Sequence, residues 1–210
     1  MATQADPPAI RLDFSEALRV LMVGLDMEGV TRSAFQSRVR QLQRMGLLKR
    51  GEGRSYERFS YGLTELARMG IAFRMMSAFM LPSVAVRYAT ERWADIVPAL
   101  IGGLDEADAQ DRWSADPPPP MPVLAIEGVA LSRLGQKAAS DSRYDGPLGR
   151  VVALAGETEL TSVLASTMTE GAVIDTRSFM PRLLQELRGL DYVSDVQIAD
   201  EVDRLRFSAL

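Results

Sequence analysis

The chain has 210 residues, of which 47% are hydrophobic, 25% charged and 7% aromatic. These ordinary globular values argue against disordered and fibrous classes and leave room for one domain or two small ones. The absence of cysteine and histidine excludes disulfides, thiol nucleophiles, cysteine-bound zinc and the Ser-His-Asp triad. This composition favours binding over catalysis, so we expect no enzyme, no catalytic residue, no metal and no cofactor.

The sequence shows no sign of a membrane span or a secretion signal. Its first residues have neither a basic start nor an apolar core. The longest uncharged apolar stretch, between Arg74 and Arg87, has twelve residues, whereas a spanning helix needs about 20. We therefore expect a soluble, cytoplasmic protein without a membrane partner.

Charge is distributed unevenly along the chain. Residues 1–100 contain 14 Lys and Arg against 10 Asp and Glu, and residues 101–210 contain 10 against 18. Residues 31–58 contain eight basic residues and only two acidic ones. A basic segment in an acidic protein is a candidate polyanion-binding surface, with a solvated helix face and charged loop as the alternative.

A change of composition predicts where the chain divides. Residues 102–122 are acidic and include four consecutive prolines, a composition typical of an extended linker that cannot continue a helix. The predicted organisation is therefore a tail, a first domain, a linker and a second domain. Their ranges are 1–14, 15–101, 102–122 and 123–210.

Helical spacing predicts two helices at the start of the first domain. The first covers residues 15–25 and is capped by Ser15. The second begins at Thr31 or Ser33 and ends before Gly46. Its apolar stripe consists of Phe35, Val39, Leu42 and Met45. Because its arginines and amides fall mostly off that stripe, this helix can bury one side and expose guanidinium and amide groups on the other.

A short hairpin and two further helices follow. Residues 47–48 and 56–59 are predicted to pair around a basic tip that contains two glycines. A third helix is predicted over 61–81. Pro82 then opens a fourth helix, which Pro98 should kink or end.

Two apolar features of these helices, a methionine cluster and Trp93, each have two interpretations. A methionine cluster is predicted to fill the core between the third and fourth helices, with a partner surface as the alternative. Trp93 is predicted either to pack in the core or to anchor a homodimer seam. The cluster consists of Met69, Met75, Met76 and Met80.

The order helix, helix, basic hairpin, helix is that of a winged helix-turn-helix domain. About residues 15–95 resemble the DNA-binding domain of the MerR family. In that family a Gly-Val turn, here Gly29-Val30, opens the recognition helix, and Gly-Leu-Leu, here residues 46–48, closes it. The chain departs from the family in having Phe59 where the wing usually has tyrosine, in lacking the long dimerisation helix, and in a recognition segment about one helical turn longer.

The resemblance implies a DNA-binding site on the second helix and the hairpin. A recognition helix (31–45) would enter the major groove, where arginine pairs with guanine and glutamine with adenine. A basic wing (49–58) would either hold backbone phosphates, through contacts that position the domain, or reach the minor groove. The predicted DNA-binding residues are Thr31, Arg32, Ser33, Gln36, Arg38, Arg40, Gln41, Arg44, Lys49, Arg50, Arg54 and Arg58.

The second domain is predicted to be a small α/β or α+β unit with a regulatory or oligomerisation role. Its acidic charge opposes nucleic-acid binding and suits a protein contact, a small-molecule sensor, a dimer interface or a fold-back onto the basic wing. Two pairs of nearby carboxylates, at 157 and 159 and at 201 and 203, are interpreted as solvated charge. The predicted strands are 122–127, 149–154 and 171–175, and the predicted helices are 158–168, 178–188 and 200–206.

These observations predict a mainly α winged helix-turn-helix domain followed by a small α/β or α+β domain. The function they favour is a cytoplasmic, sequence-specific DNA-binding transcriptional regulator. The alternative is a protein-interaction adaptor whose winged helix and acidic domain bind proteins. The expected partner is double-stranded DNA, with a homodimer and RNA polymerase or another protein as further candidates.

Overall fold

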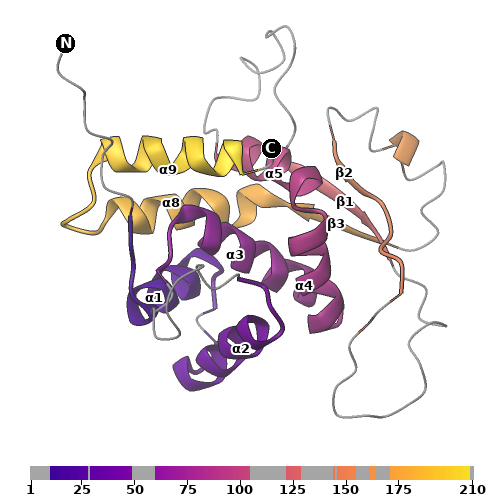
Figure 1. Cartoon of the computed structure of the whole chain (residues 1–210), viewed down its shortest axis with the longest axis horizontal. Helices are drawn as coiled ribbons and strands as arrows, with labels where there is room; N and C mark the ends of the chain where they lie inside the picture. Colours follow the sequence, from indigo (N-terminus) through magenta and orange to yellow (C-terminus); the bar gives the residue numbers. More distant parts are fainter. Residues whose placement is uncertain are drawn as a thin grey trace, which may run out of the picture.

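The protein is built mainly from helices, with one small three-stranded antiparallel sheet at one side (Figure 1). This computed structural model describes residues 10–27, 29–48, 60–104, 122–128, 144, 146–154, 161–163 and 171–208. The elements are α1 (Phe14–Gly24), α2 (Arg32–Arg44), α3 (Leu63–Ser77), α4 (Pro82–Glu91), α5 (Trp93–Leu104), β1 (Val123–Glu127), β2 (Val151–Ala153), β3 (Gly171–Asp175), η2 (Thr176–Ser178), α8 (Met180–Arg188) and α9 (Asp195–Phe207). Of the predicted hairpin, residues 47–48 are described and form a bend and not a strand, and the rest of the hairpin with the wing, residues 49–59, lies outside the described residues.

The first helix starts earlier than predicted, because Asp13 and not Ser15 is its N-cap. The Asp13 carboxylate accepts the Glu16 backbone N–H, and the Glu16 carboxylate accepts the Asp13 N–H, both at 2.9 Å. This reciprocal capping box satisfies two N–H groups, whereas a serine cap alone would satisfy one. Ser15 is left with a different role, as the acceptor of a hydrogen bond from Arg32.

The second helix confirms its predicted limits. Thr31 is the N-cap, and its hydroxyl accepts the Ala34 N–H. The last helical residue is Arg44, Met45 is the C-cap, and Gly46 follows with a φ of 91°. A left-handed residue at this position ends a helix, and glycine adopts that conformation without steric cost.

The third and fourth predicted helices do not end where the sequence predicted. α3 covers a shorter range than 61–81, and α4 begins at Pro82 as predicted. The break that was expected at Pro98 falls at Arg92 instead, and Pro98 lies inside α5. α5 continues to Leu104, into the segment predicted as a linker.

The sheet has the order β2-β1-β3, and both strand pairs are antiparallel. Strands β1 and β3 confirm the predictions at 122–127 and 171–175, and β2 is shorter than the predicted 149–154. Antiparallel pairing is the arrangement of an α+β unit, since parallel βαβ crossovers would define an α/β one.

The C-terminal segment contains helices where the sequence predicted them, but their limits differ from the predicted ones. α8 ends at the cap residue Gly189 and has a proline in its first turn, as expected. α9 begins earlier than the predicted 200–206, because Ser194 and Gln197 form a capping box at its start. Of the predicted helix 158–168, only residues 161–163 are described, and they are helical.

The larger of two hydrophobic clusters among the described residues runs through both predicted halves of the chain. A single cluster of buried residues extends from Ile10 to Leu205. α8 packs on α1, α3 and α5, and α9 packs on α3 and α5 (Figure 1). The C-terminal helices therefore cover the N-terminal ones directly.

Trp93 and the methionines belong mainly to this core. The Trp93 side chain is buried, its Nε1 donates to the Ser208 hydroxyl at 2.8 Å, and the Arg68 guanidinium lies 4.2 Å from its ring centre. Trp93 is therefore not available for a homodimer seam. Met69 and Met75 are buried, while Met76 and Met80 are partly buried against the core.

Candidate nucleic-acid interface

Helix α2 is amphipathic and turns one side to the protein. Phe35, Val39 and Leu42 are fully buried, and the Phe35 ring stacks on Phe73 of α3 with 4.8 Å between ring centres. These residues lie at i, i+4 and i+7, so they form one stripe. The packing of this stripe fixes which side of α2 faces solvent.

The opposite side of α2 is polar and basic. Its residues recur at i, i+4, i+7, i+8 and i+11, which places them on one face. The four members other than Gln41 are exposed, and Gln41 is half-buried. The outward face consists of Ser33, Ser37, Arg40, Gln41 and Arg44. No acidic residue occurs within α2.

Some predicted site residues are tied to neighbouring elements. The Arg32 guanidinium donates to the Ser15 hydroxyl at 2.6 Å, and the Arg40 guanidinium lies 5.4 Å from the ring centre of Phe14. Gln36 is half-buried on the same flank as Arg32. These contacts restrain Arg32 and Arg40, and a restrained side chain loses less rotamer entropy when it binds a ligand.

Arg38 and Arg44 have more freedom. Both are exposed, and neither makes a hydrogen bond or an ion pair with another described residue. At the start of the helix, Thr31 and Ser33 are exposed, and their hydroxyl oxygens lie 3.4 Å apart. The structure therefore places all eight predicted residues of 31–44 on or beside α2, where Gln36 and Gln41 are half-buried and the other six are exposed.

The described residues on either side of the segment 49–59 lie beside the last turn of α2. The Leu47 N–H donates to the Leu42 carbonyl, and Gln43 donates to the Tyr61 hydroxyl at 2.6 Å. Tyr61 also forms an antiparallel bridge with Leu12. Burial raises the pKa of Tyr61, while the bond from Gln43 lowers it. The predicted site residues Lys49, Arg50, Arg54 and Arg58 lie outside the described residues.

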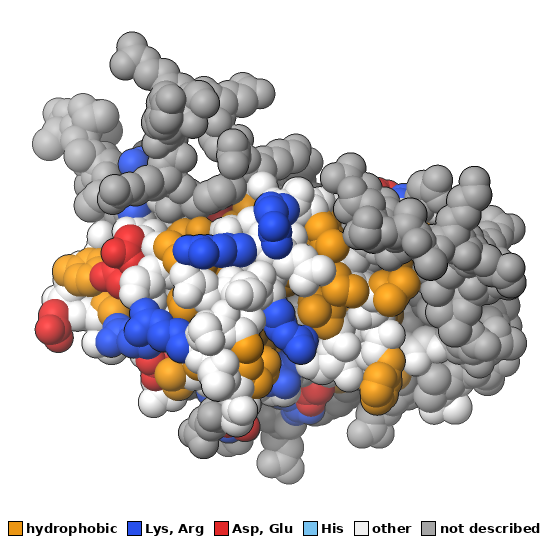
Figure 2. Space-filling view, turned by 90° about the horizontal axis from the view of Figure 1, so that it is seen from below, with side chains coloured by type: hydrophobic (Ala, Val, Ile, Leu, Met, Phe, Trp, Pro, Cys, Tyr) orange, Lys and Arg blue, Asp and Glu red, His pale blue; other side chains and the backbone are white. Residues whose placement is uncertain are grey.

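Among the charged side chains on the described part of the α2 side, basic ones predominate. Figure 2 views the molecule from below relative to Figure 1, and α2 is the lowest helix in Figure 1. Arginine side chains are spread over the described part of this face, and acidic side chains lie mainly towards its edges. Such a surface attracts polyanions.

Two features escaped the sequence predictions. Ser37 lies on the outward face of α2, and its position four residues after Ser33 was a signal that could have identified it. Glu201, interpreted as solvated, is in fact buried and accepts the Leu63 N–H at 2.8 Å. Its partner lies on α3, far away in sequence, so nothing near Glu201 signals its burial.

Other kinds of site are not seen in the described part of the chain. No three Asp or Glu residues there are grouped so that they could hold a metal ion. None of the described helices combines the length and apolar character needed to cross a bilayer. No family model, curated protein or solved structure matches this chain.

Proposed function

We propose that the protein is a cytoplasmic DNA-binding transcriptional regulator, and that α2 is its recognition helix in a winged helix-turn-helix arrangement. The observation that carries this proposal is the outward face of α2. It presents arginine, glutamine and serine side chains on a helix without acidic residues, while a buried stripe holds the helix on the body.

The chemistry of this face suits a DNA duplex. A single α-helix fits the major groove, where arginine binds guanine through two hydrogen bonds and glutamine binds adenine. Arg40, Gln41 and Arg44 supply these groups. Ser33 and the exposed start of α2 suit a phosphate, since the free N–H groups of a helix N-terminus favour an anion.

DNA binding can be tested by selecting sequences from a random duplex library and measuring affinity by fluorescence anisotropy. We expect Arg40→Ala and Arg44→Ala each to weaken binding to the selected site by about 1–3 kcal/mol, the range for one bidentate base contact. The matched control is Arg206→Ala on α9, which lies at the opposite end of the molecule from α2 (Figure 1). Its exposed ion pair with Asp203 contributes little to stability.

Salt dependence gives a second measure of the same interaction. About six phosphate contacts predict a slope of about −5 when the logarithm of affinity is plotted against the logarithm of salt concentration. No enrichment of any duplex, or an affinity that the two α2 variants leave unchanged while Arg206→Ala lowers it, would show that α2 is not the DNA-binding element.

A protein-binding role is the second candidate, and Phe79 is the observation that favours it. This residue lies between α3 and α4 with 98% of its side chain exposed and a φ of 66°. A bulky residue in the left-handed region is strained, and such strain often marks a functional position. An adaptor would lose partner binding in Phe79→Ser, whereas a DNA-binding regulator should keep its DNA affinity in that variant.

A further inference from the structure

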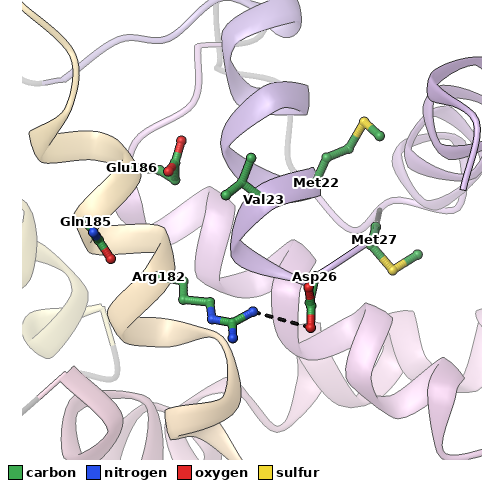
Figure 3. Close-up of a pocket in the computed structure, with 7 residues that line it drawn as sticks. All are labelled: Met22, Val23, Asp26, Met27, Arg182, Gln185 and Glu186. Carbon is green, nitrogen blue, oxygen red and sulfur yellow. Dashed lines mark ion pairs between the residues drawn. The ribbon is translucent and has the colours of Figure 1, made fainter. Parts of the chain in front are cut away.

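A cavity of about 530 Å³ lies between the end of α1, the turn that follows it, and α8 (Figure 3). Its volume is within the range of small-molecule sites, about 300–1,000 Å³. One wall comes from the N-terminal part of the chain and the other from the C-terminal part. No function described above uses this cavity.

The wall formed by α1 and its turn is largely apolar. Met22, Val23 and Met27 line it, and Val23 is 47% exposed even though it is aliphatic. Methionine side chains adapt to the shape of a ligand and make favourable sulfur contacts with aromatic rings. This wall therefore suits an apolar, preferably aromatic, group.

The wall formed by α8 is polar. Arg182, Gln185 and Glu186 lie at i, i+3 and i+4 and so share one side of the helix. Asp26 faces them from the turn after α1, and its carboxylate lies 3.4 Å from the Arg182 guanidinium. The cavity thus brings two carboxylates and one guanidinium to the edge of an apolar surface.

The local charge is balanced by a fourth group. Arg74 of α3 interacts electrostatically with both Asp26 and Arg182. Two acids and two bases therefore surround this region, and their charges cancel. A ligand that carries a single charge would lie beside at least one protein group of the same sign. A ligand with one group of each sign preserves the balance.

The Asp26–Arg182 pair is easily opened. Its two side chains are 61% and 52% exposed, and their separation of 3.4 Å exceeds that of a charge-assisted hydrogen bond. Exposed ion pairs of this kind contribute little to stability. A ligand can therefore insert between the two side chains. Its anionic group would bind Arg182 and its cationic group Asp26, each over a shorter distance than the 3.4 Å of the ion pair.

We propose that this cavity binds a small zwitterion with an apolar side chain, of the class of a free aromatic amino acid. The carboxylate of the ligand binds Arg182, its ammonium group binds Asp26, and its side chain packs on Met22 and Met27. The proposal does not depend on whether the protein binds DNA.

Methyl NMR of the full chain, labelled at the methionine methyl groups, tests the proposal with L-phenylalanine as the probe. We expect saturable shifts of the Met22 and Met27 signals, because an aromatic ring changes the field at a neighbouring methyl group. The buried Met75 methyl should not move and reports that the fold is intact. Asp26→Asn and Arg182→Gln should each weaken binding about tenfold, as expected for the loss of one bond between charged groups.

Three controls make the test decisive. Arg188→Gln, a change of charge on α8 outside the cavity, should leave the affinity unchanged. Phenylethylamine and 3-phenylpropanoate, which each lack one of the two charges, should bind about tenfold more weakly than L-phenylalanine. The proposal is overturned by an absence of shifts at millimolar L-phenylalanine, by equal binding of either analogue, or by equal effects of Arg182→Gln and Arg188→Gln.

Discussion

Glu201 shows how one carboxylate joins the last helix to the middle of the chain. It lies on α9, is 4% exposed, and accepts the Leu63 N–H at the start of α3. Glu65 accepts the neighbouring Gly62 N–H. Two acids therefore satisfy N–H groups that the start of α3 would otherwise leave unpaired.

The titration of Glu201 predicts a pH dependence of stability. Burial raises its pKa above the ordinary 4.5, and the Leu63 N–H and Arg204 lower it less. The folded state therefore holds this proton more tightly than the unfolded chain does, and stability falls as the pH rises from the ordinary pKa through the raised one. We expect E201Q, whose amide oxygen can still accept the Leu63 N–H, to lose less stability over that range in urea unfolding. A parallel decline in both proteins would contradict the assignment.

Removal of the hydrogen-bond acceptor at residue 201 should lower the stability of the protein. Glu201→Ala leaves the buried Leu63 N–H without its partner, which predicts a loss of about 1–3 kcal/mol in the free energy of unfolding. Asp203→Ala, on the exposed side of the same helix, is the matched control and should change stability by at most about 0.5 kcal/mol. Similar losses in the two variants would indicate that helix propensity, and not the cap, is responsible.

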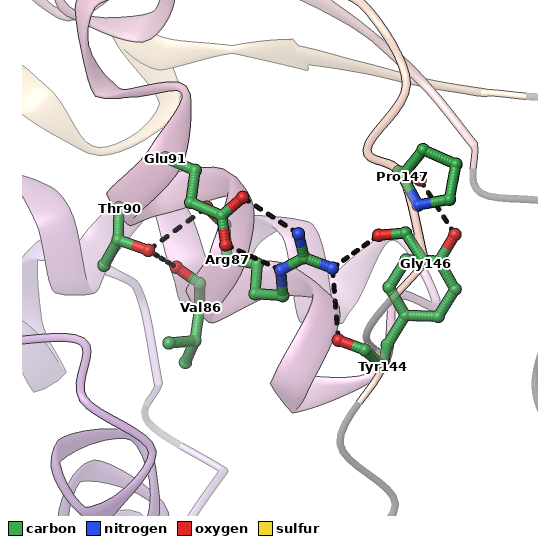
Figure 4. Close-up of polar contacts among 7 residues, drawn as sticks. All are labelled: Val86, Arg87, Thr90, Glu91, Tyr144, Gly146 and Pro147. Carbon is green, nitrogen blue, oxygen red and sulfur yellow. Dashed lines mark hydrogen bonds and ion pairs between the residues drawn. The ribbon is translucent and has the colours of Figure 1, made fainter.

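Arg87 is a second residue whose partners come from a distant segment. Its guanidinium binds both carboxylate oxygens of Glu91 and donates to the carbonyl oxygens of Tyr144 and Gly146 (Figure 4). We expect Arg87→Ala to cost about 1–3 kcal/mol in urea unfolding. Arg87→Lys should not restore this loss, since an ammonium group lacks the planar fork that reaches all four oxygens. Arg92→Ala, which breaks only the exposed 3.9 Å pair with Asp95, should have little effect.

At the scale of elements, the contact between α1 and α8 depends on a glycine. A Cβ atom at Gly24 would lie 2.9 Å from Leu183 Cγ and 3.4 Å from its Cα. Because Leu183 is fully buried, any shift of its side chain has to be accommodated by the residues packed around it. The absence of a side chain at Gly24 therefore allows the two helices to approach.

Gly24→Ala should destabilise the protein by about 1–3 kcal/mol, the usual cost of overpacking a core. Gly29→Ala is the control, because no atom lies within 4 Å of a Cβ at that position. That change should leave the stability unchanged or raise it by about 0.4–1 kcal/mol, through the loss of freedom in the unfolded chain. Thermal and urea unfolding of the two variants should differ in this direction, and a tolerated Gly24→Ala would mean that α8 can shift away from α1.

At the scale of the whole molecule, the N-terminal helices rely on the C-terminal ones for burial. Phe179, Leu183 and Leu187 of the α8 region and Leu205 of α9 are fully buried in the shared cluster. A fragment of residues 1–104 lacks all of them. The faces of α1, α3 and α5 that they cover would then be exposed to water, and burial of apolar surface is the main term that favours folding.

We expect the fragment 1–104 to lose cooperative thermal unfolding and NMR signal dispersion. As a control, a protease site inserted between residues 105 and 121 should yield two pieces that remain associated after cleavage, because the shared core holds them together. A well-folded fragment 1–104 would instead mean that the N-terminal half is an independent domain, as the change of composition at 102–122 suggests.

Several features of the protein follow from local patterns in the sequence. The apolar spacing of Phe35, Val39 and Leu42, the cap at Thr31 and the glycine after Met45 define α2 and its exposed basic side, because each signal lies within one or two helical turns. The same holds for the strands β1 and β3. Three other features come from the tertiary fold: Glu201 is buried, Trp93 is a core residue, and α1 and α8 line an open cavity. These features depend on contacts between residues far apart in the chain, and no local pattern encodes which distant helix will cover a given face.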